Sequence, residues 1–486
     1  MASTLPDPIP DAHAHRMAAD GKNTDMTGAP ERAGGIEAHG IDHIPDSERR
    51  GRPRELFSVW AAANVNYLSL VVGGALVLMG LSLWQAMAVI VVGNLFWLLT
   101  GLLAIPGPAA GAPSEVITRA MYGVLGNRVN NAVTGWMISV CYFALNLAAA
   151  ATAAFSLVAR TGLPVNTGVK ALVVVLIAAV TLAISVWGHA AIIRLYVPIT
   201  LALTAVFAVV GFVVVRHADF GYVPDRPLSG TALWATLLAG VALIASGPLS
   251  YTTSADFSRY LPRTASARAV AGWTAFGGFL SSVLVCGIGA FAATTVDMNE
   301  PESSLQRLLP GWFRPLFLLA LVLGTVALNA LTAYSAGLAL QAVGLRIRRS
   351  RSVLVDGTVS VALTLYALLV SDFLDTVGNV LQLTVVLLGP STAVYATDIL
   401  LRRNRYDGLA LGDESRNAPF WYTGGFNWAG AVALGAGVAA SAVCVDTAYT
   451  GPVAAALGDA DLALPAGLIV SSAVYALLMR RLRVTG

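Results

Sequence analysis

The chain has 486 residues, of which 56% are hydrophobic and 12% charged, and its mean hydropathy is +0.71. Soluble domains usually contain about 25% charged residues, so this composition excludes an ordinary soluble domain and indicates a protein that crosses the membrane many times. The net charge of +3 is small and the three cysteines lie in apolar runs, so we expect no nucleic-acid partner, disulfide framework, metal site or cofactor.

The first segment, residues 1–54, differs from the rest of the chain. It is rich in Asp, Glu, Pro, Gly and His and shows no apolar period, so we expect a disordered cytoplasmic tail. No apolar h-region precedes the first span, which argues against a cleavable signal peptide. The tail ends in a basic patch at residues 49–54, just before the apolar sequence begins.

Uncharged intervals divide the remaining chain into twelve expected membrane spans. Most intervals are near or above the roughly 20 residues that a helix needs to cross a bilayer. The first interval holds two spans, and the short interval 357–371 extends back to Ser352. The uncharged intervals are 56–114, 129–159, 171–193, 195–215, 227–255, 269–296, 315–345, 357–371, 376–397, 417–445 and 462–479.

The distribution of arginine predicts the orientation of these spans. Arginines lie after spans six, eight and ten and at the C-terminus, whereas the loops after spans nine and eleven contain Asp and no Lys or Arg. Cytoplasmic loops carry the excess of basic residues, so we expect a multi-pass protein of the cell membrane with both termini in the cytoplasm. The alternation is weaker in the first half of the chain.

Two of the expected spans are interrupted. The first contains two amides, Asn64 and Asn66, inside an apolar run. Five spans later the run Ser246-Gly247-Pro248 interrupts span six, because Pro248 has no N–H to donate to the Ile244 carbonyl. Interruptions at matching positions of two five-span halves are typical of inverted-repeat transporters and mark the binding site. The alternative is a proline-kinked packing helix.

The segment 112–128, between spans two and three, places Glu115, Arg119 and Arg128 among apolar residues. We expect an amphipathic cytoplasmic helix that lies at the membrane interface. No pattern around Glu115 suggests catalysis.

Spans three and eight carry polar groups as well. Tyr142 and Asn146 are four residues apart and share one helix face, and Asn329 and Thr332 lie in span eight. Such groups can simply hold helices together, but their presence in four spans favours a binding site.

Three stretches carry a resemblance to a known family. They are Ser254-Ala255-Asp256-Phe257-Ser258-Arg259-Tyr260, then residues 389–403, which begin Gly389-Pro390-Ser391, and finally Phe426-Asn427-Trp428. In this order the chain resembles the nucleobase–cation symporter family 1, the purine–cytosine permeases and their hydantoin, allantoin and vitamin-transporting relatives.

The resemblance implies an all-α polytopic membrane protein of about twelve helices. Its fold would be the 5+5 inverted repeat of the bacterial leucine transporter, followed by two C-terminal helices. The transporter core would span residues 55–403, with repeats at about 55–215 and 227–403, and the C-terminal helices would occupy residues 404–486.

The resemblance also implies a substrate site between spans one, three, six and eight. Tyr142 would stack on a ring and Asn146 would bond its edge. Other contacts would come from Asn66, Ser246, Gly247 and Asn329, with Pro248 at the break. Gly247 stands where some relatives have a bulky aromatic, and Ala333 stands where some have a second amide.

These features favour a transporter over an enzyme. No charged residue lies at midplane depth in the expected site, which suits a neutral planar nitrogen heterocycle such as cytosine or a purine. Alternatives are allantoin, hydantoin or a pyrimidine or pyridine vitamin, or an amino acid carried by the same fold. A membrane enzyme would need clustered His, Asp, Glu or Cys within the spans.

A coupling cation is the remaining expectation. In sodium-coupled relatives, span-one carbonyls, here those of Ala62 and Val65, meet two hydroxyls of span eight. Ala327 and Leu328 stand in place of those hydroxyls, so we expect proton coupling, or facilitated exchange, over sodium coupling. The first candidate proton acceptor is Asp256 and the second is Asp356. The alternative for Asp256 is a structural ion pair with Arg259 or with a loop arginine.

Overall fold

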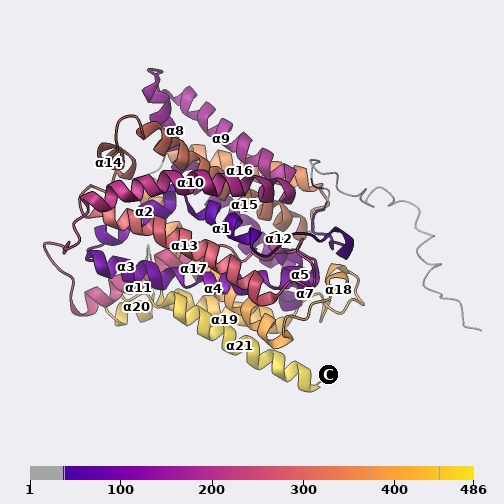
Figure 1. Ribbon diagram of the computed structural model, residues 1–486. Coiled ribbons are helices and arrows are strands. Elements are labelled where there is room, and N and C mark those ends of the chain that lie inside the picture. The colour runs from indigo at the N-terminus through magenta and orange to yellow at the C-terminus, as the bar shows by residue number, and fades with distance from the viewer. Residues whose placement is uncertain (1–36, 38, 371–372, 448, 486) are drawn as a thin grey trace, which may run out of the picture.

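The structure, a computed structural model, describes residues 37, 39–370, 373–447 and 449–485 (Figure 1). This part of the chain is helical and contains no β-sheet. The helices are α1 Glu55–Asn64, α2 Tyr67–Leu78, α3 Leu83–Asn94, α4 Trp97–Ala104, α5 Pro106–Ala110, α6 Ser114–Ile117, α7 Arg119–Asn130, α8 Ile138–Arg160, α9 Thr167–Trp187, α10 His189–His217, α11 Gly230–Leu249, α12 Ala255–Ser258, α13 Ala267–Ala293, α14 Pro301–Leu308, α15 Arg314–Ala342, α16 Arg349–Val370, α17 Phe373–Arg402, α18 Gly408–Gly412, α19 Trp428–Cys444, α20 Pro452–Ala456 and α21 Ala463–Thr485, with a 3-10 turn η1 Asp46–Glu48 and a π-helical stretch η2 Asn131–Met137.

The helices agree with the expected order of spans. Within the described residues, ten continuous helical stretches are long and apolar enough to cross a membrane, and the bent pair α1 and α2 makes an eleventh. Helix α19 takes the remaining place, but its 17 residues are fewer than a full crossing normally needs. The expectation of an all-α polytopic membrane protein is therefore confirmed.

The bundle is arranged around the first helix pair (Figure 1). Helices α1, α13 and α15 lie at its centre, and α9 and α16 lie on one side. The two C-terminal helices α19 and α21 pack on each other and on α17 along the opposite side. The broken helices thus lie inside the bundle, where other helices can satisfy their backbone groups.

The first break divides α1 from α2 at Val65 and Asn66, where the chain bends by 59°. Asn66 has an extended backbone and caps α2, because its side-chain oxygen accepts from the Ser69 N–H at 3.0 Å. Its amide nitrogen donates to the Ala63 carbonyl at the end of α1 at 2.7 Å. The Asn66 side chain therefore bonds the end of α1 and the start of α2. The interruption itself lies where the sequence predicts it.

The second break lies later than the sequence suggests. Helix α11 continues through Pro248 to Leu249, and the chain unwinds only over residues 250–254. Pro248 removes a single donor, while the Ser250 N–H still reaches the Ser246 carbonyl at 3.0 Å. Thr100 of α4 donates to the Pro248 carbonyl at 2.8 Å and so satisfies the end of α11. The expected break at 246–248 is corrected to 250–254.

Part of the expected disordered tail is packed against the bundle. Ile44 is fully buried, and Arg49 donates to the Ile44 and Pro108 carbonyls. Residues 37 and 39–54 therefore do not belong to a disordered tail, while residues 1–36 and 38 lie outside the described part. A basic patch does not require a disordered segment, because an arginine that donates to backbone carbonyls can be buried.

Glu37 is the centre of this packing and is 3% exposed. It forms ion pairs with Arg259 at 3.1 Å and with Arg349 at 3.4 Å, and the Tyr334 hydroxyl donates to it at 2.8 Å. Burial alone would raise the pKa of Glu37, but the charges of Arg349 and Arg259 lower it to about 2. Glu37 therefore links the N-terminal segment to α15, α16 and the chain after α12.

Helices α2 and α13 lie unusually close together. A Cβ added to Gly73 would overlap the Cys286 carbonyl oxygen, and one added to Gly289 would overlap the Leu70 carbonyl oxygen. The backbones of the two helices therefore touch without a layer of side chains between them, as small residues allow in membrane proteins.

Candidate functional site

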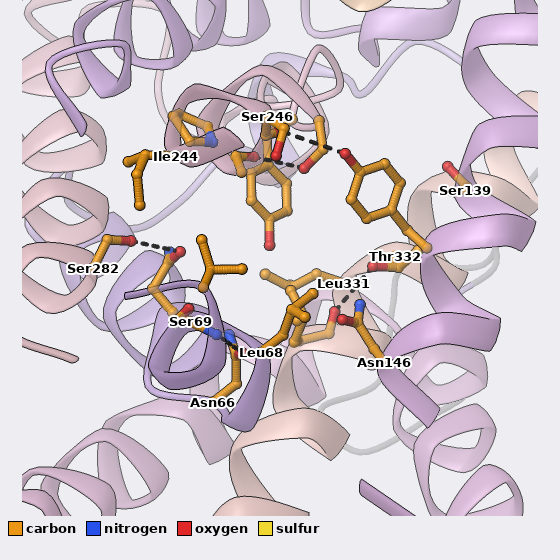
Figure 2. Close-up of a pocket in the computed structure, with 18 of the residues that line it drawn as sticks. Asn66, Leu68, Ser69, Ser139, Asn146, Ile244, Ser246, Ser282, Leu331 and Thr332 are labelled. Atoms are coloured by element: carbon orange, nitrogen blue, oxygen red, sulfur yellow. Dashed lines mark hydrogen bonds between the residues drawn. The ribbon is translucent and has the colours of Figure 1, made fainter. Parts of the chain in front are cut away.

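A cavity of about 900 Å³ lies at the meeting point of the two breaks (Figure 2). Helices α2, α3, α8, α11, α13 and α15 contribute to its wall, together with the chain on either side of the breaks. Its lining contains no Asp, Glu, Lys, Arg or His among the described residues. The polar lining residues include Asn64, Asn66, Ser69, Asn94, Ser139, Tyr142, Asn146, Ser246, Tyr251, Ser282 and Thr332.

Tyr142 and Asn146 both line the cavity from α8, as their spacing predicts. The Tyr142 hydroxyl bonds the Thr384 hydroxyl at 2.9 Å and approaches the Ser246 carbonyl at 3.4 Å, which fixes the ring against the wall. The side-chain oxygen of Asn146 is buried and has no partner among the described residues. An amide acceptor without a partner is available to a ligand.

The broken helices bring the other predicted residues to the same cavity. Asn66, Ser246, Gly247 and Pro248 all line it. A Cβ added to Gly247 would meet no heavy atom within 4 Å, so this residue leaves open space inside the cavity. The amide of Asn66 is already used by the backbone at the first break, so its side chain shapes the wall.

Asn329 is an exception and does not line the cavity. It is 1% exposed, and its amide nitrogen donates to the Phe143 carbonyl of α8 at 3.0 Å. Asn329 lies in α15 as predicted, but its side chain turns toward the Phe143 carbonyl of the neighbouring helix. Asn329 therefore holds α15 against α8 in this structure and lies behind the lining of the cavity.

An aromatic cluster beside the cavity was missed by sequence reasoning. Trp60, Trp97, Tyr251 and Phe257 pack edge to face or tilted, with ring centroids 4.8–5.5 Å apart for the contacting pairs. Tyr251 and Phe257 also line the cavity. Both lie in or beside the unwound segment after α11, and this placement was the available signal.

Asn64 and Ser282 form another polar group that the sequence did not single out as a pair. The Ser282 hydroxyl donates to the Asn64 side-chain oxygen at 2.9 Å across the cavity wall (Figure 2). Ser282 lies in an uninterrupted apolar run, where a serine is ordinary. Ser282 and Cys286 both line the cavity, and their spacing of four residues is the one sequence signal that they share a face of α13.

The predicted cation region lies between the first break and α15. A Cβ on Gly324 would overlap the Val65 carbonyl oxygen, so α15 packs directly on the break. Ala62 and Val65 are buried there, and neither lines the cavity. The hydroxyls of Thr325 and Thr332 donate to carbonyls of their own helix, at 3.0 and 3.2 Å.

The two candidate proton acceptors are both fully buried and lie outside the cavity lining. Asp256 accepts from the Ser114 N–H at 2.8 Å and from the Ser335 hydroxyl at 2.6 Å. It forms no ion pair among the described residues, because Arg259 pairs with Glu37; the alternative of an Asp256–Arg259 pair is therefore wrong. Asp356 lies in α16, and neither carboxyl oxygen has a partner in the described part of the chain.

Comparison with known sequences points to one family. Residues 43–463 match the family described as permease for cytosine/purines, uracil, thiamine, allantoin. The chain is also 26% identical over 461 residues to a Bacillus subtilis (strain 168) protein named "Putative purine-cytosine permease YxlA", with 92% of this chain and 96% of that protein covered.

Solved structures show a similar fold. Mhp1, a nucleobase-cation-symport-1 family transporter in a closed conformation with bromovinylhydantoin bound, has a TM-score of 0.76 at 17% identity, covering 93% of this chain and 97% of that chain. A Na⁺-coupled sialic acid symporter in an outward-open state has a TM-score of 0.56 at 13% identity, covering 89% of this chain and 91% of that one. At such identities the likeness shows the fold alone. It agrees with the expected inverted repeat, since broken helices begin both halves.

Proposed function

The chain belongs to the family of permeases for cytosine and purines, uracil, thiamine and allantoin, and on this premise we propose that it imports a neutral planar nitrogen heterocycle of the cytosine or purine type by cation symport. The family and the long apolar helices show that the protein is a multi-pass membrane transporter. The kind of substrate and the cation are our proposals.

The uncharged lining of the cavity is the observation that carries this proposal. A charged or zwitterionic substrate would normally be met by an ionisable residue in the lining. The cavity instead offers the Tyr142 ring and the free side-chain oxygen of Asn146. Stacking on a ring and bonding along its edge are the contacts that a nucleobase can use.

The same contacts would also suit allantoin, a hydantoin or a ring-containing vitamin, so the choice among them is made by the shape of the cavity. The open space at Gly247 favours a ring stacked on one face by Tyr142 over a ring held between two aromatics. An amino-acid substrate is disfavoured by the absence of charged residues from the described lining.

We assign proton coupling in preference to sodium coupling. Sodium is a hard cation that needs several oxygen ligands, and Ala327 and Leu328 supply no side-chain oxygen. The hydroxyls of Thr325 and Thr332 donate to carbonyls of their own helix, and they lie three and four residues from Leu328, away from the two positions that would supply the ligands. The carbonyls of Ala62 and Val65 alone would leave the cation poorly coordinated.

We also assign the end of the bundle that contains the N-terminal segment and the C-terminus to the cytoplasm (Figure 1). The arginine-rich loops favour this orientation. A cysteine introduced in the 446–461 loop should react with an impermeant reagent from outside the cell, and one in the 404–415 segment should not. The reverse result would overturn the orientation.

Uptake by proteoliposomes tests the function. Labelled cytosine, adenine and leucine would be offered in parallel, with choline in place of sodium and with or without a protonophore. We expect uptake of cytosine or adenine that survives choline and falls with the protonophore. Uptake of leucine alone would refute the substrate class, and strict dependence on sodium would refute proton coupling.

A further inference from the structure

Two acidic residues outside the substrate cavity are both almost completely buried. Glu115 in α6 is 1% exposed, and Asp256 in α12 is 0% exposed. They lie at the end of the bundle where α5, α7 and α12 gather (Figure 1). The sequence predicted an amphipathic helix here; the segment is helical, but α6 and much of α7 are buried against other helices and do not form a surface helix.

The Asp256 carboxylate is held by donors on both oxygens. The Ser114 N–H donates to one oxygen at 2.8 Å and the Ser335 hydroxyl donates to the other at 2.6 Å. In return the Ser114 hydroxyl accepts from the Ala255 N–H at 3.1 Å. These bonds fasten α6 to the start of α12 and bring the two carboxyl groups together.

The Glu115 carboxyl group is in the opposite situation. Its backbone carbonyl accepts from the side-chain amides of Asn127 at 2.6 Å and Asn131 at 3.1 Å, so its backbone is fixed. Neither side-chain oxygen receives a bond from a donor in the described part of the chain. Its chain neighbour Ser114 donates to Asp256 at 2.8 Å, so the Glu115 side chain lies close to the Asp256 carboxyl, with which it interacts. Two carboxyl groups can bond each other only through a proton, because neither carboxylate has a donor.

Few charged or titratable groups face this pair. Arg259 follows α12 and is the nearest cation, but it is committed to Glu37 at 3.1 Å and to the Gly40 carbonyl at 2.6 Å. Tyr395 of α17 lines the same small cavity as Glu115 and is close enough to both carboxyl groups to feel their charge. Burial first, and then the neighbouring Asp256 charge, raise the pKa of Glu115 well above its usual value, and burial also raises the pKa of Asp256.

The pair is connected to the substrate cavity through two residues. Ser335 lines that cavity and donates to Asp256. Glu115 lines a second cavity of about 290 Å³, and Thr253 lines both cavities. The carboxyl pair is therefore one hydrogen bond away from the substrate cavity and adjoins a separate polar space of its own.

We propose that Glu115 and Asp256 share one exchangeable proton and form the proton-binding site that couples transport. This proposal rests on the proposed proton symport. Release of the proton leaves two adjacent negative charges buried away from water, which is energetically costly. Release therefore requires water to reach the second cavity, and this requirement ties the proton to the conformation of α6 and α12.

The test uses the full chain purified in proteoliposomes, with Glu115→Gln as the main variant. Infrared titration detects the carbonyl band of a protonated carboxylic acid, which a carboxylate lacks. We expect a titrating band in the wild type that Glu115→Gln removes, because Asp256 alone keeps donors from Ser114 and Ser335 that favour its charged form. Glu302→Gln, a partly buried carboxyl in α14, serves as the matched control and should leave the band unchanged.

A second variant keeps both carboxyl groups and so guards against misfolding. Ser335→Ala removes a donor that stabilises the charged form of Asp256, and it should move the midpoint of the infrared titration upward by about one to two pH units. An unchanged midpoint would contradict the shared-proton arrangement.

Transport of labelled cytosine gives the functional readout. In Glu115→Gln, accumulation driven by an imposed pH gradient should be lost, while exchange of labelled for unlabelled cytosine should persist. An unchanged titrating band in this variant, or loss of coupling only in Asp356→Asn, would overturn the proposal. A band that is lost as expected in a protein that does not move cytosine would leave the proton site standing and refute the substrate instead.

Discussion

The most informative single perturbation of the substrate cavity is truncation of Tyr142. Its ring forms part of the cavity wall, and its hydroxyl is held by Thr384 at 2.9 Å. Tyr142→Phe keeps the ring and loses that bond, which costs about 0.5–1.5 kcal/mol of folding stability. Tyr142→Ala also removes the surface on which a base can stack.

Stacking of a base on an aromatic side chain is worth about 1–3 kcal/mol, so Tyr142→Ala should weaken binding by about 5- to 150-fold. Tyr142→Phe should bind within about fivefold of the wild type, since the hydroxyl is directed at Thr384 and Ser246 within the protein. Equilibrium binding of labelled cytosine to the purified protein measures both effects. Tyr366→Ala, at a residue with 61% of its surface exposed on the outside of the bundle, is the control.

The outcome that would refute this reasoning is a folded Tyr142→Ala protein that binds cytosine as tightly as the wild type. It would mean that the ring only fills space between α8 and α11. A loss of equal size in both variants would instead assign the effect to the hydroxyl and its partners.

Other perturbations follow from the same geometry. Asn146→Ala should change which bases compete for uptake, since its free side-chain oxygen can bond a ring edge. Asn329→Ala should lower thermal stability and leave the ranking of competing bases unchanged. The same ranking in both variants would mean that Asn146 only joins helices. Gly247→Ala should transport normally, whereas Gly247→Trp should block uptake because its side chain fills the open space in the cavity. Equal uptake by both variants would mean that the substrate binds elsewhere. Glu37→Gln should lower the free energy of unfolding at neutral pH by about 3–5 kcal/mol because it leaves Arg259 and Arg349 without their buried partner. Since folding lowers the pKa of Glu37 from 4.5 to about 2, its contribution is full above pH 4.5 and fades as the pH falls toward 2; a difference that instead grows in acid would contradict this assignment.

Much of the architecture could be predicted because lipid imposes strict rules on sequence. Uncharged runs of sufficient length mark the spans, and a break at Asn64–Asn66 is visible because amides are rare in such runs. The spacing of Tyr142 and Asn146 predicts a shared face, and both residues line the cavity. These signals depend on local sequence alone.

The failures concern groups whose partners are distant in the chain. Asn329 looks like a binding residue until the Phe143 carbonyl is placed beside it. The local sequence predicts no functional role for Glu115, because no catalytic or binding pattern surrounds it. Only the fold brings it close to Asp256, 141 positions later. Pro248 does not end α11 where the sequence predicts. The carbonyl of Pro248 accepts a hydrogen bond from Thr100, which lies on another helix and cannot be identified from the local sequence.

The direct backbone contact between α2 and α13 has a practical consequence for measuring motion. Gly73 and Gly289 leave no side chains between the helices that could rearrange, so their separation stays fixed unless the pair comes apart. Probes attached to the outer faces of α2 and α13 therefore form an internal ruler of constant length. Against that ruler, a change in distance from α2 to α8 reports opening of the cavity rather than swelling of the whole protein.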